Sequence, residues 1–416
     1  MAYGRGMSLS EGRVWLGILG ALLSTAVVGA DWPCFRGPNH DGISRETAWR
    51  KNWTEAAPVA MWRAEVGIGF SAVSVAGDRV ITTGHQDGEE VVWCLASDTG
   101  KVIWTHRHKS ELGAKFYIGG PGATPSIDPV SGDVYVLGKW GQFFCLRLKD
   151  GTPRWQRNLV RDHNLLLPDW GFNGSALVVG DLVIVNMGTN GIALERGSGR
   201  TKWASEGSES GYSTPLPYEV DGHQRVVVSS GEGYSGVEPT TGELIWTVPW
   251  FTRYGVNAAD PIVWQGRLFI SSGYSKGAGQ FTLSPSTKGD ELQMVWKQRR
   301  FRAQQNAPVR LGEYLYGFDG DSSSRAKLKC VEWNTGEVVW EDETLGYGAL
   351  SAAGEHLILI GADGQLGLAV ASPKAFEPVL GGKVLAADCW TVPVLAGGKI
   401  LCRNSHGSLV CLDVSL

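Results

Sequence analysis

The stretch CLASDTGKVIW (residues 94–104) joins an apolar segment to a tryptophan through a Thr-Gly turn, and it recurs along the chain. Close copies are CLRLKDGTPRW (145–155), ALERGSGRTKW (193–203), GVEPTTGELIW (236–246) and CVEWNTGEVVW (330–340). FTLSPSTKGDELQMVW (281–296) is a stretched copy, GLAVASPKAFEPV (367–379) lacks both the Gly and the Trp, and CLDVSL (411–416) is truncated. Two strands that meet at a turn where glycine supplies a positive φ make a β-hairpin, so the pattern predicts eight hairpins.

A second landmark precedes each hairpin, a short strand opening of the form x-Ser/Thr/Ala-x-Pro or a relative of it. The eight openings read FSAV (70–73), GATP (122–125), NGSA (173–176), YSTP (212–215), AADP (258–261), QNAP (305–308), YGAL (347–350) and WTVP (390–393). With the β-rich run after each opening, one unit holds four strands in about 40–50 residues, which is typical of a propeller blade. We therefore predict an all-β fold, an eight-bladed β-propeller of four-stranded antiparallel blades. An open β-sandwich array is the alternative.

The last unit lacks its fourth strand, while an unassigned strand, APVAMWRAEVG (57–67), stands before the first opening. This strand carries a tryptophan that matches the repeated one. We expect it to pair into the C-terminal blade and close the ring, which leaves no open sheet edge. The repeated tryptophans are expected to fill the wedges between adjacent blades; they are Trp62, Trp104, Trp155, Trp203, Trp246, Trp296 and Trp340.

The N-terminus precedes this predicted propeller (57–416). Arg5 and Arg13 give the chain a basic start and precede the apolar run VWLGILGALLSTAVV (14–28). This run is shorter than the roughly 20 residues of a membrane span. Small residues at Val28 and Ala30 suit a signal peptidase, so residues 1–30 predict a signal peptide cleaved near Ala30, with an uncleaved anchor as the alternative. The mature protein is then expected to be secreted or periplasmic, monomeric and without a membrane span.

Residues 31–56 are interpreted as an N-terminal strap. Its first part, DWPCFRGPN (31–39), is expected to pack Trp32 and Phe35 on the side of the propeller, and a partner-binding motif is the alternative.

Composition limits the function further. Apolar residues make up 43% of the chain and charged residues 19%, so a large core is expected and global disorder is not. The net charge of −4 gives no electrostatic basis for nucleic-acid binding.

Four cysteines share one repeated, apolar-flanked position and are interpreted as buried hydrophobes; they are Cys94, Cys145, Cys330 and Cys411. One disulfide among Cys34, Cys389 and Cys402 remains open, and no Cys or His spacing predicts a metal site.

The repeats resemble pyrroloquinoline-quinone (PQQ) repeats over about residues 57–416. Such repeats occur in bacterial quinoprotein alcohol dehydrogenases and in the propeller lipoprotein scaffold of the outer-membrane barrel-assembly machine. DWPCFRGPNHDGIS (31–44) also resembles the opening of secreted bacterial PQQ-repeat proteins of unassigned role. The resemblance implies the propeller fold, but enzymes and scaffolds share that fold.

A quinoprotein dehydrogenase needs a Ca²⁺ ion held by carboxylate and amide oxygens, an Asp base and an aromatic platform, and many carry two adjacent cysteines. The chain has no adjacent cysteine pair. DGDSSS (319–324) begins like a calcium loop, but Cys330 stands where its last ligand should be Glu. We therefore expect a binding or scaffold module for an unknown protein or small-molecule ligand. A PQQ-dependent oxidoreductase acting on alcohols, with PQQ and Ca²⁺, is the alternative.

The openings of the blades are the expected ligand site, because inner strands line the central channel of a propeller and their starts form one mouth. Aromatic and amide side chains gather there, and they suit a planar or sugar-like ligand or a peptide strand. Alternatively, they only satisfy the inner-strand backbone and fill the channel. The candidates are Trp170, Asn173, Tyr212, Asn257, Tyr274, Arg302, Gln305, Asn306, Tyr347 and Trp390.

Overall fold

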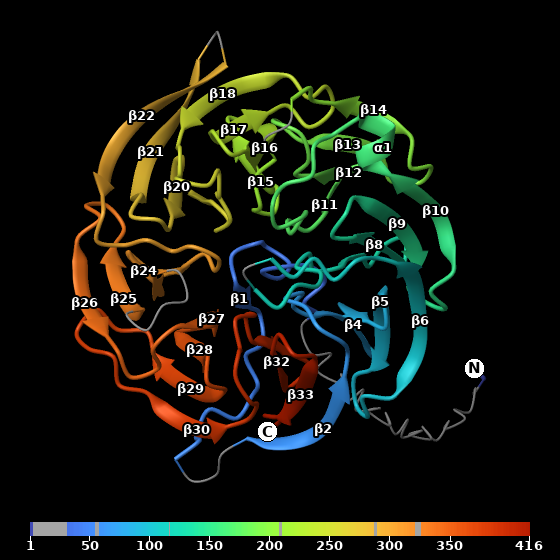
Figure 1. Ribbon diagram of the computed structural model, residues 1–416. Coiled ribbons are helices and arrows are strands. Elements are labelled where there is room, and N and C mark those ends of the chain that lie inside the picture. The colour runs from blue at the N-terminus through green and yellow to red at the C-terminus, as the bar shows by residue number, and fades with distance from the viewer. Residues whose placement is uncertain (3–30, 55–57, 116, 208–209, 287–288, 321–325) are drawn as a thin grey trace.

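Eight β-sheets surround a central axis in the computed structural model, as Figure 1 shows. The structure describes residues 1–2, 31–54, 58–115, 117–207, 210–286, 289–320 and 326–416. The prediction of an eight-bladed propeller of four-stranded antiparallel blades is confirmed. Nearly all of the predicted signal peptide, residues 3–30, lies outside the described residues.

Each blade follows the chain from the axis outward. Blade 1 holds β3 (Ser74–Ala76), β4 (Arg79–Gln86), β5 (Glu89–Ala96) and β6 (Val102–Lys109). Blade 2 holds β7 (Ser126–Asp128), β8 (Asp133–Leu137), β9 (Gln142–Arg147) and β10 (Pro153–Asn158), and a short helix, α1 (Leu159–His163), follows it. Blade 3 holds β11 (Leu177–Val179), β12 (Leu182–Val185), β13 (Ile192–Glu195) and β14 (Thr201–Ala204). Blade 4 holds β15 (Leu216–Val220), β16 (His223–Ser229), β17 (Gly233–Val237) and β18 (Leu244–Pro249).

The second half of the ring repeats this order. Blade 5 holds β19 (Ile262–Trp264), β20 (Arg267–Ser272), β21 (Gly277–Ser286) and β22 (Gly289–Gln298). Blade 6 holds β23 (Val309–Leu311), β24 (Tyr314–Asp319), β25 (Lys327–Glu332) and β26 (Val338–Asp342). Blade 7 holds β27 (Gly348–Ala353), β28 (His356–Gly361), β29 (Gln365–Val370) and β30 (Val379–Lys383), and β1 (Ile43–Ser44) joins it as a fifth, parallel strand. Blade 8 holds β31 (Val394–Ala396), β32 (Lys399–Arg403) and β33 (Ser408–Asp413), with β2 (Val59–Glu65) outermost.

The repeated tryptophans explain how adjacent blades pack. Trp104 on the outer strand of blade 1 donates its indole N–H to Leu148 O in the hairpin of blade 2, over 2.9 Å. Its ring lies on Gly151 in that hairpin turn, which has φ +72°, and a Cβ there would come within 2.5 Å of Trp104 Cε3. The turn glycine is therefore required for both its positive φ and the close approach of the indole.

The same pairing recurs around the ring. Trp155, Trp203 and Trp296 lie on Gly199, Gly242 and Gly336 of the following blade. They donate to the carbonyl oxygens of Arg196, Pro239 and Trp333. Trp340 donates to Ser372 O in the hairpin of blade 7 that has lost its glycine.

Trp246 is different, because the next hairpin is the stretched one. Its indole donates to Tyr218 Oη of its own blade over 2.7 Å. Tyr218 in turn donates to Asp290 Oδ2 of blade 5 over 3.1 Å. The link to the next blade is therefore indirect.

The ring closes as predicted. β2 pairs antiparallel with β33, and the register places Trp62 opposite Cys411. The Trp62 indole packs on Gly100 of blade 1 and donates to Ser97 O. The first strand of the propeller thus completes its last blade and carries the wedge tryptophan that joins blade 8 to blade 1.

The N-terminal segment lies in the central channel, so the expected position on the side of the propeller was wrong. We call residues 32–44 the channel loop. Trp32 forms a bridge with Val75 of blade 1, and Pro33 O accepts a hydrogen bond from Ile127 N of blade 2. The loop leaves through β1, which pairs with β27 of blade 7 (Figure 1). These inner strands leave backbone groups unpaired toward the axis, and the loop satisfies some of them.

Arg36 anchors the channel loop. Its side chain is 2% exposed, and Nη1 and Nη2 donate to the carbonyl oxygens of Ala307 and Pro308 of blade 6, both over 3.0 Å. Nη2 and Nε also donate to Asp41 O and His40 O within the loop. The guanidinium therefore ties the loop to the wall of the channel through backbone carbonyls.

Two further tryptophans follow the channel loop. Trp49 and Trp53 are buried in the core between blades 7 and 8, together with Ile358 and Ile400. A Cβ on Gly381 of β30 would lie 3.3 Å from Trp53 Cε3. The N-terminal segment thus fills the wedge next to the one hairpin that has lost its own tryptophan.

All seven cysteines lie in the described residues and are free. The four at the repeated position are buried, in agreement with the interpretation as small hydrophobes. Among the described residues, no helix has the length and apolar character needed to cross a membrane.

Candidate ligand-binding cavity

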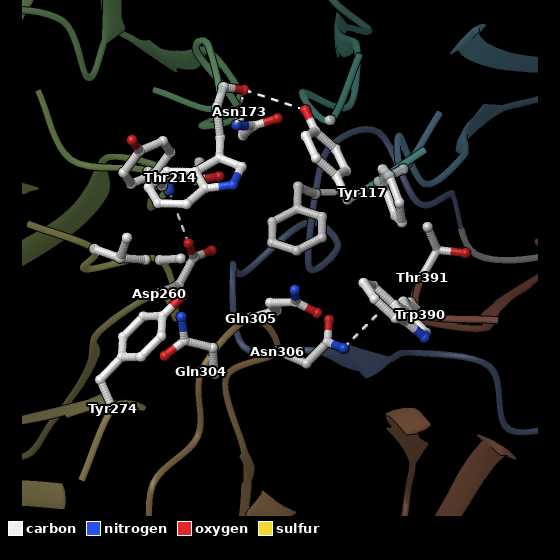
Figure 2. A pocket seen from close by; sticks show the side chains of 17 residues that line it. Tyr117, Asn173, Thr214, Asp260, Tyr274, Gln304, Gln305, Asn306, Trp390 and Thr391 are labelled. Atoms are coloured by element: carbon white, nitrogen blue, oxygen red, sulfur yellow. Dashed lines mark hydrogen bonds between the residues drawn. The ribbon is translucent and has the colours of Figure 1, made fainter. Parts of the chain in front are cut away.

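A cavity of about 330 Å³ lies on the axis, where the inner strands of the blades begin (Figure 2). The first residue of each four-residue opening supplies most of its wall. Seven of these eight positions line the cavity: Phe70, Gly122, Asn173, Tyr212, Ala258, Gln305 and Trp390. Phe35 of the channel loop lines it as well. The axial cavity is therefore walled by the blade openings and by the channel loop.

In blades 1 to 5 the third residues of the openings link one blade to the next. Ala72 N donates to Thr124 Oγ1, and Thr124 N donates to Ser175 Oγ. Ser175 N donates to Thr214 Oγ1, and Thr214 N donates to Asp260 Oδ1 over 2.7 Å. This chain of hydrogen bonds crosses five blades and explains why Ser and Thr recur in the motif. It fixes the positions from which the neighbouring cavity residues project.

Asp260 ends this chain and lines the cavity. Its side chain is buried, and burial raises the pKa of the carboxyl to about 6, although Arg36 and the amide of Thr214 lower it. Figure 2 shows Asp260 on the same side of the cavity as Thr214, Tyr274 and Gln304, across from Trp390 and Thr391. Among the described residues that line the cavity, Asp260 alone carries a formal charge.

A buried lysine supports another part of the wall. Lys139 Nζ donates to Tyr117 Oη, to Trp170 O over 2.9 Å and to Gly120 O over 3.3 Å. Tyr117 and Trp170 both line the cavity. Burial lowers the pKa of Lys139 to about 8, and the nearby carboxylate of Glu90 opposes this shift. Lys139 thus joins two loops that carry aromatic rings of the wall.

Aromatic rings also hold one another in place. Phe70 lies between Tyr117 and Trp390, with ring centroids 5.6 and 5.5 Å apart. Trp170 and Tyr212 make an edge contact at 6.0 Å. Seven of the 17 lining residues are aromatic, so the wall offers several apolar faces to a ligand.

The structure brings together seven of the ten candidates from the sequence. The cavity is lined by Trp170, Asn173, Tyr212, Tyr274, Gln305, Asn306 and Trp390. Asn306 Nδ2 donates to Trp390 O over 2.9 Å, so the amides of blade 6 are oriented by the neighbouring openings.

The other three candidates lie outside the lining. Asn257 is fully buried, and its amide nitrogen donates to Ser230 O and Trp250 O. Arg302 forms an ion pair with Asp319 at 2.9 Å. Tyr347 donates to Gln305 Oε1 over 2.7 Å and therefore supports a wall residue from behind.

Sequence reasoning did not select several lining residues. Asp260 occupies the third position of AADP, where the other openings carry Ser, Thr, Ala or Val, and this charged residue was an available signal. Phe35 was missed because the strap was placed on the side of the propeller. Tyr117, Thr214, Gln304 and Thr391 belong to the openings or to the loops before them.

The cavity does not fit PQQ with Ca²⁺. PQQ carries three carboxylate groups, but no Lys or Arg is among the described lining residues, and Asp260 would repel an anion. A Ca²⁺ site needs several oxygen ligands, including carboxylates, and Asp260 is the one carboxylate in the described lining. The described residues contain no cluster of three or more His, Cys, Asp or Glu side chains placed to hold a metal ion.

The ring of eight blades, with its repeated tryptophan and its axial cavity, defines a PQQ-repeat β-propeller. The chain belongs to the family described as outer membrane protein assembly factor BamB, which matches residues 59–165 and 88–342. No curated protein is similar to the chain in sequence.

Two solved structures illustrate the shared fold. BamB from Moraxella catarrhalis is 16% identical with a TM-score of 0.61, and the match covers 86% of this chain and 98% of that chain. The quinohemoprotein alcohol dehydrogenase from Comamonas testosteroni is 12% identical with a TM-score of 0.65, and the match covers 92% of this chain and 80% of that chain. At these identities the likeness concerns the fold.

Proposed function

We propose that this protein is an extracytoplasmic binding module that takes a ligand in its axial cavity. The observation that carries the proposal is the axial cavity itself, which combines aromatic walls with amides and one buried carboxylate. Binding sites for small molecules are typically concave and apolar, with a few fixed polar groups. Here hydrogen bonds between successive openings fix the wall before any ligand arrives.

The competing function is a PQQ-dependent oxidoreductase. It is considered because the Comamonas dehydrogenase has a similar fold. The lining residues favour the binding module, because they offer neither cations for the quinone carboxylates nor a set of carboxylates for Ca²⁺. A scaffold role with a protein partner at the cavity mouth is compatible with the family.

A ligand screen on the purified protein tests the proposal. Thermal unfolding is followed with a library of small polar and aromatic compounds, and PQQ with Ca²⁺ forms a separate arm with dye reduction as its readout. Ala258→Phe fills the cavity, while Ala204→Phe places the same ring on an exposed position of β14. We expect stabilisation by at least one compound in the wild type and in Ala204→Phe, and none in Ala258→Phe. Quinone-dependent dye reduction, or stabilisation that survives Ala258→Phe, would contradict the proposal.

The extracytoplasmic location rests on the predicted signal peptide and on the family. Expression of the full chain in a Gram-negative host, followed by fractionation and N-terminal sequencing, tests it. A mature N-terminus at Asp31 is expected in the periplasmic fraction. Recovery of the intact chain in the cytoplasm would argue against export.

A further inference from the structure

The charge of the cavity wall selects among ligand classes. Asp260 Oδ1 accepts a hydrogen bond from Thr214 N. Among the described residues no hydrogen bond reaches Oδ2, and Asp260 forms no ion pair within 4.0 Å. Oδ2 of this buried carboxylate is therefore available to interact with a ligand in the cavity.

The nearest cation does not neutralise this carboxylate directly. The guanidinium of Arg36 acts on Asp260 through space, but its donors are engaged by the carbonyl oxygens of His40, Asp41, Ala307 and Pro308. The other titratable groups that interact with Asp260 are Cys34 and Tyr234, and burial raises the pKa of both. Both are neutral near pH 7, so neither adds a positive charge.

Aromatic rings complete the environment. Trp170, Tyr212 and Tyr274 line the same cavity as Asp260. The negative faces of aromatic rings attract cations, and this attraction strengthens where water is excluded. A carboxylate beside such rings stabilises a positive charge and disfavours an anion.

We infer that the axial cavity takes an organic cation, a protonated amine or quaternary ammonium on a compact body, with its charge beside Asp260. This inference rests on the proposed function and names the ligand class for the same cavity. Nε2 of Gln305 and Oδ1 of Asn306, which take no part in the bonds to Tyr347 and Trp390, can meet polar groups elsewhere on the ligand. A neutral sugar would use the same amides and rings but would gain no charge interaction at Asp260.

Matched probe pairs separate charge from shape. Binding of choline is compared with that of 3,3-dimethylbutan-1-ol, and D-glucosamine with D-glucose, by calorimetry at pH 7 and pH 5. We expect the cation of at least one pair to bind the wild type about tenfold more tightly or better, as a favourable ionic or cation–π interaction implies. The preference should shrink at pH 5, because Asp260, with its pKa near 6, is then protonated.

Two variants locate the charge. Asp260→Asn keeps the acceptor for Thr214 N and should lose the preference, whereas Asp181→Asn, at a fully exposed side chain, should keep it. If Asp260→Asn does not fold, the pH dependence of the wild type decides. Equal affinities within both pairs, or a preference that survives Asp260→Asn, would overturn the inference. If neutral and cationic probes bind equally well, the proposed binding function holds and only the inferred ligand class is wrong. If none of the four probes and no compound of the wider library binds, the proposed function and the inferred ligand class are both wrong.

Discussion

The indole Nε1 of Trp62 donates a hydrogen bond over 2.8 Å to the carbonyl oxygen of Ser97, and this bond crosses the seam where the ring closes. Trp62 belongs to blade 8 and Ser97 to blade 1, so this contact and the pairing of β2 with β33 hold the two ends of the propeller together. The stability of the whole ring should therefore depend on this one side chain.

Trp62→Ala is expected to lower the free energy of unfolding by ~3–5 kcal/mol, the range for loss of a buried aromatic side chain. Trp62→Phe keeps much of the packing and loses the hydrogen bond, which costs about 1 kcal/mol. Urea denaturation measures both. Trp140→Ala, on a loop outside the inter-blade wedges, is the control. Equal losses of stability for Trp62→Ala and Trp140→Ala would contradict a special role for the seam. Deletion of residues 59–65, which form β2, should lower the stability of the whole ring.

Arg36→Met tests the anchoring of the channel loop. The substitution leaves the carbonyl oxygens of Ala307 and Pro308 without their donors. Unsatisfied buried groups cost about 1–3 kcal/mol each, so for these two carbonyl groups we expect a loss of ~2–6 kcal/mol in the free energy of unfolding. Arg45→Met makes the same change at an exposed position of the N-terminal segment and should cost less than ~0.5 kcal/mol. A similar effect for both variants in thermal unfolding would argue that the loop is only loosely held.

Asp260→Asn should stabilise the protein at neutral pH. Burial raises the pKa of Asp260 from 3.8 to about 6, so between these values the folded state holds a proton that the unfolded chain releases. The free energy of unfolding of the wild type therefore falls as the pH rises through this window, and the full cost remains above it. We expect Asp260→Asn to gain ~3 kcal/mol at pH 7 and little at pH 4, since one pKa unit is worth about 1.4 kcal/mol. Denaturation of both proteins from pH 4 to pH 8 measures the difference, and Asp181→Asn should show no such trend.

Lys139→Met should show the opposite pH trend. Burial lowers the pKa of Lys139 from 10.5 to about 8, so between these values the unfolded chain binds a proton that the folded state has released. The free energy of unfolding of the wild type should rise relative to that of Lys139→Met by ~3 kcal/mol between pH 8 and pH 10.5. Chemical denaturation across this range measures the gap. A constant difference between the two proteins would show that Lys139 is not desolvated beneath Tyr117 and Trp170.

Much of the fold could be predicted, because propeller blades repeat. At five junctions between blades the tryptophan of one blade contacts the turn glycine of the next, so the same interaction leaves the same residues in the sequence several times. The unassigned strand around Trp62 could be matched to the unfinished last blade for the same reason. The repeat also placed the openings at the mouth, and seven of the ten candidates line the cavity.

The remaining features are not periodic. The channel loop depends on contacts such as that between Arg36 and Ala307, which are 271 residues apart and occur once. Asn257 directly precedes the opening AADP (258–261), yet its amide donates to the backbone of blade 4 and does not reach the cavity. Such differences depend on side-chain direction at a single site, and neither residue type nor spacing records that direction.

The position of the channel loop has a consequence for biosynthesis. Its partners in blade 6 emerge from the ribosome 271 residues later, which takes roughly 15–55 s at about 5–20 residues per second. The strand β33, which β2 needs, emerges later still. Until then Trp49 and Trp53, both buried in the finished protein, lack the surface of blades 7 and 8 that covers them. The earliest part of the propeller to be made is thus among the last to reach its native contacts, and a chaperone that shields this segment would act on the step at which the nascent chain is most exposed to aggregation.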